Sequence, residues 1–128
     1  MSPRGGPDGG GRRGGRALAG ALAALALVAC ESRDWDHTPP PGMGSLVVDN
    51  RASDGLHLYV DGVHTQYVDR GDYEIVDLAP GVRRVVLDQA HGSRAWRGDV
   101  DVLDGKLTVL DVADGYGPST YDVRVTFD

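Results

Sequence analysis

Three aspartates in the last third of the chain have a spacing that could serve a cation. Asp99 and Asp101 are followed by Asp104 and Gly105, and hard cations such as Ca²⁺ favour several carboxylates that converge on a turn. However, Asp99 and Asp101 alternate along a predicted strand, and Leu110 stands where an EF-hand loop would place its bidentate glutamate. We therefore expect no calcium site here.

The histidines and serines form no recognisable catalytic pattern. His57, His64 and His91 have neither the i, i+4 spacing of a helical zinc site nor neighbouring cysteines, so we expect them at surface or turn positions. No Gly-x-Ser-x-Gly nucleophile elbow surrounds Ser45, Ser53, Ser93 or Ser119. We expect no catalytic residue, metal or cofactor. A small metal-dependent hydrolase would instead need Asp99, Asp101 and His91 to cluster in the folded chain.

Two arginines lie in predicted loops. Arg70-Gly71-Asp72 matches an integrin-binding tripeptide, but all three are common turn residues and we interpret the match as chance. A protease inhibitor would present Arg94 or Arg70 to its target, and this function remains an alternative.

The first 29 residues have the layout of an export signal. Residues 1–16 are glycine-rich with four arginines, and residues 17–29 are uncharged and apolar. A spanning helix needs about 20 apolar residues, so this run, which Glu31 and Arg33 follow closely, is too short for a permanent transmembrane anchor. Arg12-Arg13 lacks the apolar pair that follows in a twin-arginine signal.

The end of this segment, Leu27-Val28-Ala29-Cys30, resembles the lipobox of bacterial lipoproteins. The resemblance implies that signal peptidase recognises Leu27, Val28 and Ala29, that residues 1–29 are removed, and that the Cys30 thiol receives diacylglycerol. Further acylation, for example by palmitate, would make the anchor firm, since each buried methylene contributes about 0.8 kcal/mol. An ordinary secretory signal with an incidental cysteine is the alternative.

The charge of the chain limits the classes of partner that it can bind. Four of the 13 basic residues and one of the 19 acidic residues precede Cys30, so 9 basic and 18 acidic residues follow it. This negative charge disfavours binding to nucleic acid.

Cys30 is the only cysteine, so no disulfide forms within one chain. The expected location is the bacterial cell envelope, and Glu31 rather than aspartate after Cys30 favours the outer membrane over the cytoplasmic membrane.

Residues 30–44 are expected to form a lipidated tether. The segment is charged, then proline-rich, then interrupted by glycine, and it has neither helical nor strand periodicity. Trp35 and His37 lie within it. A single tryptophan near a lipid chain adds little to the anchor and one histidine does not hold a metal ion, so we expect neither role.

Residues 45–128 read as one small all-β domain. Short apolar or alternating runs are separated every seven to twelve residues by Gly, Asp and Pro, which predicts an antiparallel β-sandwich of about seven strands. Leu56, Leu58 and Val60 share one face, and Trp96 is expected in the core. Asp61-Gly62 and Asp104-Gly105 predict hairpin turns. The expected strands cover 46–48, 56–61, 64–68, 73–78, 82–88, 96–102, 106–112 and 121–127.

Within this domain, residues 45–112 resemble the PEGA domain, a small β-sandwich of bacterial envelope proteins. The similarity lies in Gly44-Ser45-Leu46-Val47-Val48, Leu58-Tyr59-Val60-Asp61-Gly62 and Leu78-Ala79-Pro80-Gly81. The Pro-Glu-Gly-Ala run that names the family is absent, and a related prealbumin-like or regulatory sandwich is the alternative. The resemblance implies a non-catalytic module that binds a protein or polysaccharide of the envelope.

Overall fold

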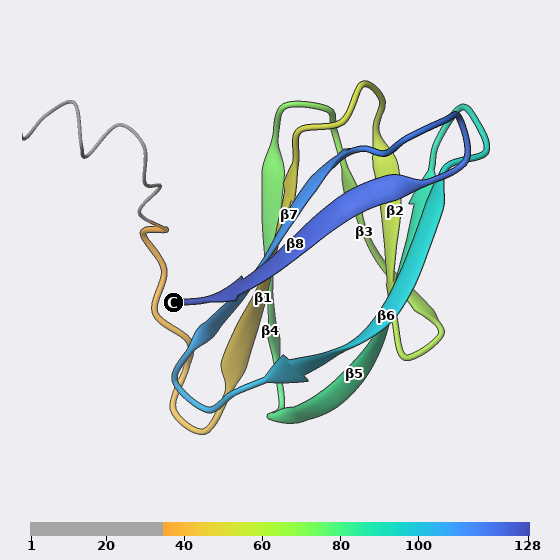
Figure 1. The fold of residues 1–128 in the computed structure, drawn as a ribbon. Coiled ribbons are helices and arrows are strands. Elements are labelled where there is room, and N and C mark those ends of the chain that lie inside the picture. Colours follow the sequence, from red (N-terminus) through yellow and green to blue (C-terminus); the bar gives the residue numbers. More distant parts are fainter. Residues whose placement is uncertain (1–34) are drawn as a thin grey trace, which may run out of the picture. The chain divides into compact units, whose positions relative to one another are not determined.

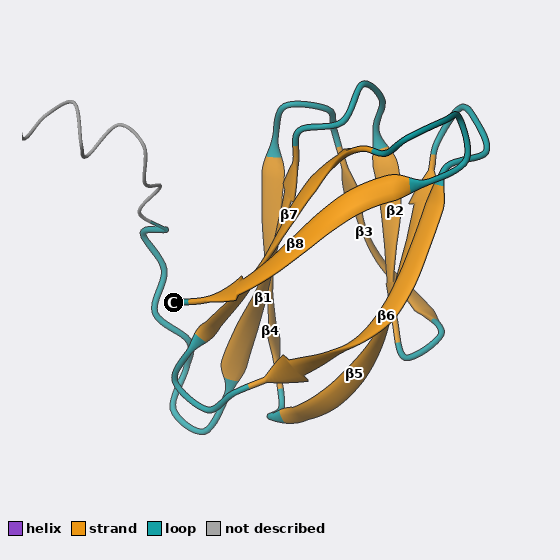
Figure 2. Cartoon of the chain, viewed as in Figure 1, coloured by secondary structure: helices purple, strands orange, loops and turns teal. Residues whose placement is uncertain are grey.

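The alternating runs form eight strands and no helix in residues 35–128, the part of the chain that the computed structural model describes (Figures 1 and 2). The predicted all-β fold is confirmed. The strands are β1 (Gly44–Asn50), β2 (Leu56–Val60), β3 (Val63–Val68), β4 (Tyr73–Leu78), β5 (Gly81–Gln89), β6 (Ala95–Val102), β7 (Leu107–Asp114) and β8 (Tyr121–Phe127). No helix long and apolar enough to cross a membrane occurs in this described part.

The strands form two four-stranded sheets that face each other as a sandwich (Figure 1). The strand orders are β4-β1-β7-β8 and β3-β2-β5-β6. All pairs are antiparallel except β1 and β7, which run parallel. The predicted small β-sandwich of about seven strands is confirmed, and the one departure from antiparallel pairing is β1 with β7. This pair is parallel because the chain crosses to the other sheet, as β5 and β6, before β7 lies beside β1.

The turn at Asp104-Gly105 corrects a second prediction. The chain does turn there, with Gly105 at a φ of 74°, but β6 and β7 do not pair with each other. β6 pairs with β5 in one sheet and β7 pairs with β1 in the other. The turn therefore carries the chain between the sheets instead of closing a hairpin.

The core lies between the two sheets and takes one face of each strand. Leu56, Leu58 and Val60 are buried together, as the alternation of β2 predicts. Trp96 is partly buried and packs against this core, which fits its predicted place. The other buried members include Leu46, Val48, Val68, Val85, Leu87, Leu110 and Val112.

Burial falls along β8, although its sequence alternates without a break. Tyr121 is buried, whereas Phe127 at the other end is 51% exposed. Tyr121 and Val123, in the first half of β8, pack against the core, and Ala95 of β6 bridges Thr120 just before β8 begins. Apolar alternation in β8 therefore does not lead to burial along its whole length.

Asn50, the last residue of β1, joins both sheets to the loops at that end. Its side chain is fully buried. The amide nitrogen donates to the carbonyls of Asp54 and Val68, at 2.9 and 3.1 Å, and the amide oxygen accepts from the Ala52 N–H at 3.0 Å. Its backbone N–H donates to the Asp72 carbonyl. One buried amide thus satisfies backbone groups of the β1–β2 loop and of β3 in the other sheet.

The second half of the expected tether belongs to the folded unit, which begins at His37. His37 Nε2 lies 2.8 Å from Asp77 Oδ1 on β4, and the Ser45 hydroxyl donates to the same oxygen. These two hydrogen bonds, from Ser45 and then from His37, hold the pKa of Asp77 below its ordinary value. The Gly105 N–H donates to the Met43 carbonyl. Residues 37–43 are therefore held against the sandwich, and Gly44 already belongs to β1.

We expect Asn50→Ala to lower the free energy of unfolding by about 3 kcal/mol, because it leaves buried backbone groups without partners. Urea denaturation followed by circular dichroism measures the change. Gln66→Ala, which removes a half-buried amide from β3, serves as the control and is expected to cost less than about 1 kcal/mol. Equal losses in both variants would contradict the role given to Asn50.

Candidate binding surface at one end of the sandwich

Three loops meet at the end of the sandwich where β1 finishes (Figure 1). They are residues 51–55, 90–94 and 115–120, and hydrogen bonds connect the first to its neighbours. The Ser53 N–H donates to Asp114 Oδ1 at the end of β7. The Ala90 N–H donates to the Gly55 carbonyl, and the His91 N–H donates to Asp54 Oδ2 at 2.8 Å. The loops are therefore one connected structure.

Asp54 is the acidic centre of these connections. Partial burial alone would raise its pKa, but hydrogen bonds from the His91 side chain and backbone and from the Gly55 N–H outweigh it and lower the pKa. The ordinary pKa of aspartate is about 3.9, so this carboxylate is charged at neutral pH. It acts here as an acceptor that holds the 90–94 loop in place.

Arg94 organises the 115–120 loop from inside. Its Nη1 donates to the carbonyls of Gly117 at 2.6 Å, Thr120 at 2.8 Å and Gly115 at 3.4 Å. Its Nε lies 3.3 Å from Asp114 Oδ1, and its side chain is only 16% exposed. The planar guanidinium suits such a set of acceptors because its five N–H donors point in fixed directions.

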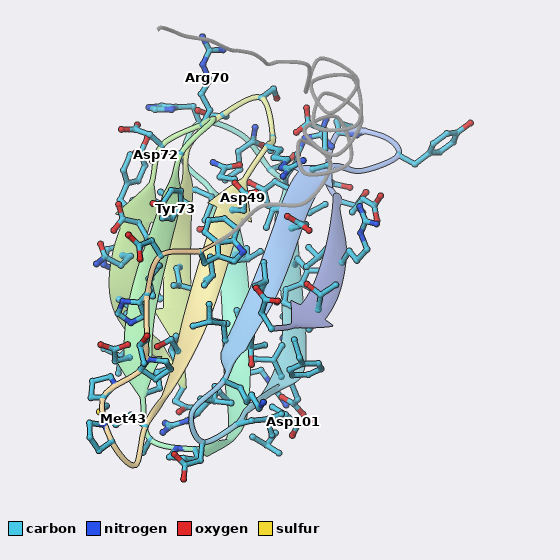
Figure 3. All side chains as sticks on the ribbon, turned by 90° about the vertical axis from the view of Figure 1, so that its left-hand side faces the viewer. Met43, Asp49, Arg70, Asp72, Tyr73 and Asp101 are labelled. Atoms are coloured by element: carbon cyan, nitrogen blue, oxygen red, sulfur yellow. The ribbon has the colours of Figure 1, made fainter. Side chains whose placement is uncertain are left out.

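This placement bears on the protease-inhibitor alternative. Arg94 cannot extend into a protease pocket without giving up the contacts that hold the loop. Of the two arginines considered for that role, Arg70 is the exposed one, and it points away from the sandwich (Figure 3). It lies in the tight β3–β4 turn, where Gly71 has a φ of 77°.

Tyr116 stands at the tip of the loop that Arg94 holds. Its side chain is fully exposed. Gly115 before it must be glycine, because a Cβ there would lie 2.8 Å from the Thr120 carbonyl oxygen. Gly117 after it has a φ of 89°, a left-handed value that favours glycine. The loop therefore displays an aromatic ring on a backbone that tolerates few other residues.

One hollow adjoins this ring, and a second hollow shares Asp122 with the first. The first, about 440 Å³, is lined by Asp114, Gly115, Tyr116, Thr120, Tyr121 and Asp122. The second, about 210 Å³, lies on the outer face of β7 and β8 and is lined by Arg51, Asp111, Val112, Ala113, Asp122 and Arg124. We call Tyr116 and the residues that line these two hollows the loop-end surface.

The groups of this surface are held in place by neighbouring charges. Arg51 Nε lies 2.9 Å from Asp49 Oδ2, whose side chain is 2% exposed, and this hydrogen bond and charge raise the pKa of Arg51. Burial raises the pKa of Tyr121 to about 12, so its hydroxyl stays protonated. The loop-end surface thus combines fixed charges of both signs with one exposed ring.

The three aspartates considered for calcium do not meet. Asp99 forms an ion pair with Arg84 on β5, and Asp101 lies farther along β6, opposite Val82. His91 lies beyond the other end of β6 and contacts Asp54. Within residues 35–128 no three or more His, Cys, Asp or Glu residues are grouped to hold a metal ion.

Two of the histidines do meet. His57 Nδ1 and His64 Nε2 lie 3.0 Å apart on an exposed face, a contact that their spacing in the sequence did not indicate.

The predicted lipobox lies outside the described residues, which begin at residue 35. Its residues are Leu27, Val28, Ala29 and Cys30. No protein-family model matches the chain, and no curated protein matches it. The lipobox and PEGA resemblances therefore stay predictions.

We expect Arg94→Ala to release the 115–120 loop and to cost about 2 kcal/mol of stability, because charge-assisted hydrogen bonds to three carbonyls are lost. Amide hydrogen exchange should speed up in residues 115–120. Arg97→Ala, which removes an exposed arginine from β6, should leave that exchange unchanged. Unaltered exchange in the Arg94 variant would show that the loop is held by other contacts.

Proposed function

We propose that this chain is a lipid-anchored, non-catalytic binding module of the bacterial cell envelope, attached to its membrane through acyl chains on Cys30. The observation that carries the proposal is the pairing of an export signal that ends in a lipobox-like Cys30 with a small sandwich whose connected loops display Tyr116. The loop-end surface is the part that binds. The partner is a protein or a polysaccharide of the envelope.

The folded unit begins at the end of the sandwich opposite the loop-end surface, which favours anchoring through the N-terminal segment and binding through the loops. His37 is held beside Asp77, and Asp77 is the cross-strand partner of Ser45 near the start of β1. The loop-end surface lies where β1 finishes. Residues 30–36 would then connect the lipid to the sandwich, and seven extended residues span at most about 25 Å. The proposal therefore assigns anchoring to the segment before His37 and binding to the loop end.

The chemistry of the loop-end surface fits a neutral or mixed-charge partner. An exposed tyrosine presents a large apolar ring with a polar tip, and aromatic residues and arginine are enriched where proteins bind. Asp114 and Asp122 line the hollow beside the ring, and Arg124 lines the second hollow, so the surface offers acceptors and donors of both signs. The excess of acidic residues after Cys30 disfavours nucleic acid and anionic lipid as partners.

The anchoring half of the proposal is tested by the intact mass of the protein from the membrane fraction of its host. We expect the mass of residues 30–128 plus acyl groups, and we expect Cys30→Ala to lack those acyl groups and to leave the membrane fraction. A parent protein that is soluble and unacylated would overturn the proposal and leave Cys30 as a free thiol.

The binding half is tested by photo-crosslinking in intact cells. A photoreactive phenylalanine analogue in place of Tyr116 should crosslink to an envelope component, and mass analysis of the adduct tells protein from polysaccharide. The same analogue at Val63, which is 66% exposed but lies at the β2–β3 turn, is the control and should give no specific adduct. Equal crosslinking at both positions would argue against the loop-end surface.

A further inference from the structure

The β2–β3 hairpin places two histidines side by side, and its tight turn fixes how they meet. Asp61 and Gly62 have φ values of 51° and 83°, the left-handed values that a two-residue hairpin turn requires. Asp61 Oδ1 accepts from the Arg84 N–H and Asp61 Oδ2 accepts from the Arg83 guanidinium. The hairpin is therefore tied to β5 at its tip.

Beyond the turn, a β-bulge changes which residues of β3 face outward. Tyr59 pairs with His64, but Leu58 pairs with Gln66, so Thr65 is the additional residue. The Thr65 hydroxyl donates to the Val63 carbonyl at 2.9 Å. Such a bulge redirects every side chain that follows it. Without it, Tyr67 would point toward the core.

The new register sets a cluster of rings on the outer face of the hairpin. Leu56 and Val68 pair with both side chains in the core, so their neighbours His57 and Tyr67 pair on the outer face. His64 is opposite Tyr59, which makes it the diagonal neighbour of His57. Diagonal neighbours on one face of an antiparallel pair lie within reach of long side chains.

The two imidazoles meet through ring nitrogens and not through their faces. His57 Nδ1 and His64 Nε2 are 3.0 Å apart, and the rings are tilted by 55°. Tyr67 packs beside His57 with ring centroids 5.1 Å apart, and Tyr59 packs edge-on to His64 at 5.2 Å. Each histidine is thus supported by a tyrosine that limits its rotation.

From this arrangement we propose that His57 and His64 form a two-ligand binding site for a divalent transition-metal ion. Imidazole nitrogens suit Zn²⁺, Cu²⁺ and Ni²⁺. Two nitrogens bound to one ion lie about 3.3 Å apart in tetrahedral geometry and about 2.9 Å apart when adjacent in a square plane. The observed separation falls between these values, so both nitrogens can bind one ion at nearly their present spacing once the rings turn to point their lone pairs at it.

The surroundings of the pair favour a cation. Asp88 is the cross-strand partner of His57 on β5 and adds a negative charge to the same face. The site is exposed, so water or a group from another molecule completes the coordination. Protons compete with metal ions for neutral imidazole, and occupancy therefore falls as the pH falls.

Cu²⁺ is the probe for this site, because it binds nitrogen ligands more tightly than the other divalent ions of its row. The full chain in detergent, carrying Cys30→Ser to remove the thiol and no histidine tag, is titrated and followed by electron paramagnetic resonance. We expect one equivalent of Cu²⁺ with nitrogen hyperfine structure. His57→Gln or His64→Gln should weaken binding at least about tenfold, since even the loss of an outer-shell partner costs that much.

His91→Gln is the matched control, because His91 is also exposed but contacts Asp54 instead of another histidine. It should bind Cu²⁺ as the parent does. Equal binding in all three variants, or no binding to the parent, would overturn the proposal.

A second measurement avoids variants altogether and covers the case in which one of them fails to fold. Zn²⁺ should protect His57 and His64 of the otherwise unchanged protein from acylation by diethyl pyrocarbonate and should leave His91 reactive. Unprotected His57 and His64 at saturating Zn²⁺ would also overturn the proposal.

Discussion

The buried amide of Asn50 is the interaction on which both the sandwich and its loop end depend. It bonds to backbone groups of the β1–β2 loop and of β3, and β3 lies in the opposite sheet. A buried polar side chain is tolerated only when its donors and acceptors are satisfied, and a satisfied one specifies a single arrangement of its partners. Asn50 therefore fixes where the two sheets and the first loop meet.

Further hydrogen bonds connect the β1–β2 loop, which Asn50 holds, to the two other loops at the same end of the sandwich. Asp54 follows Asn50 by four residues and holds the 90–94 loop through His91. Arg94 at the end of that loop holds residues 115–120. Tyr116 is thus displayed by a series of contacts that begins in the core. Rigid display lowers the entropy lost on binding, which agrees with the proposed role of the loop end.

The outer face of the β2–β3 hairpin is organised by separate means. Its tip is held by Arg83 and Arg84 of β5, and the bulge at Thr65 sets the register. None of the contacts described for the loop end involves His57 or His64. The proposed metal site on the hairpin and the proposed partner site on the loops therefore use separate residues of one small domain, and each proposal can be tested without the other.

Local chemistry explains which features could be predicted from the sequence. Alternation over 56–60 and 121–127 identified strands, and Asp61-Gly62 identified a turn, because side-chain period and positive φ are properties of neighbouring residues. The predicted export signal and its lipobox-like Cys30 likewise rest on contiguous residues. The eight strands appear within a few residues of the expected runs. The sequence alone thus determined the fold class, the strand positions and the chemistry available at the N-terminal segment.

Only the tertiary structure decided which distant residues meet. The parallel pairing of β1 with β7, the placement of residues 37–43 and the pairing of His57 with His64 each join segments through contacts that leave no local pattern. Arg94 looked like an exposed loop arginine because its acceptors lie more than twenty residues away. A one-residue bulge was enough to turn Tyr67 outward. Pairing between strands is set by the total fit of the buried faces, and a single strand does not contain that information.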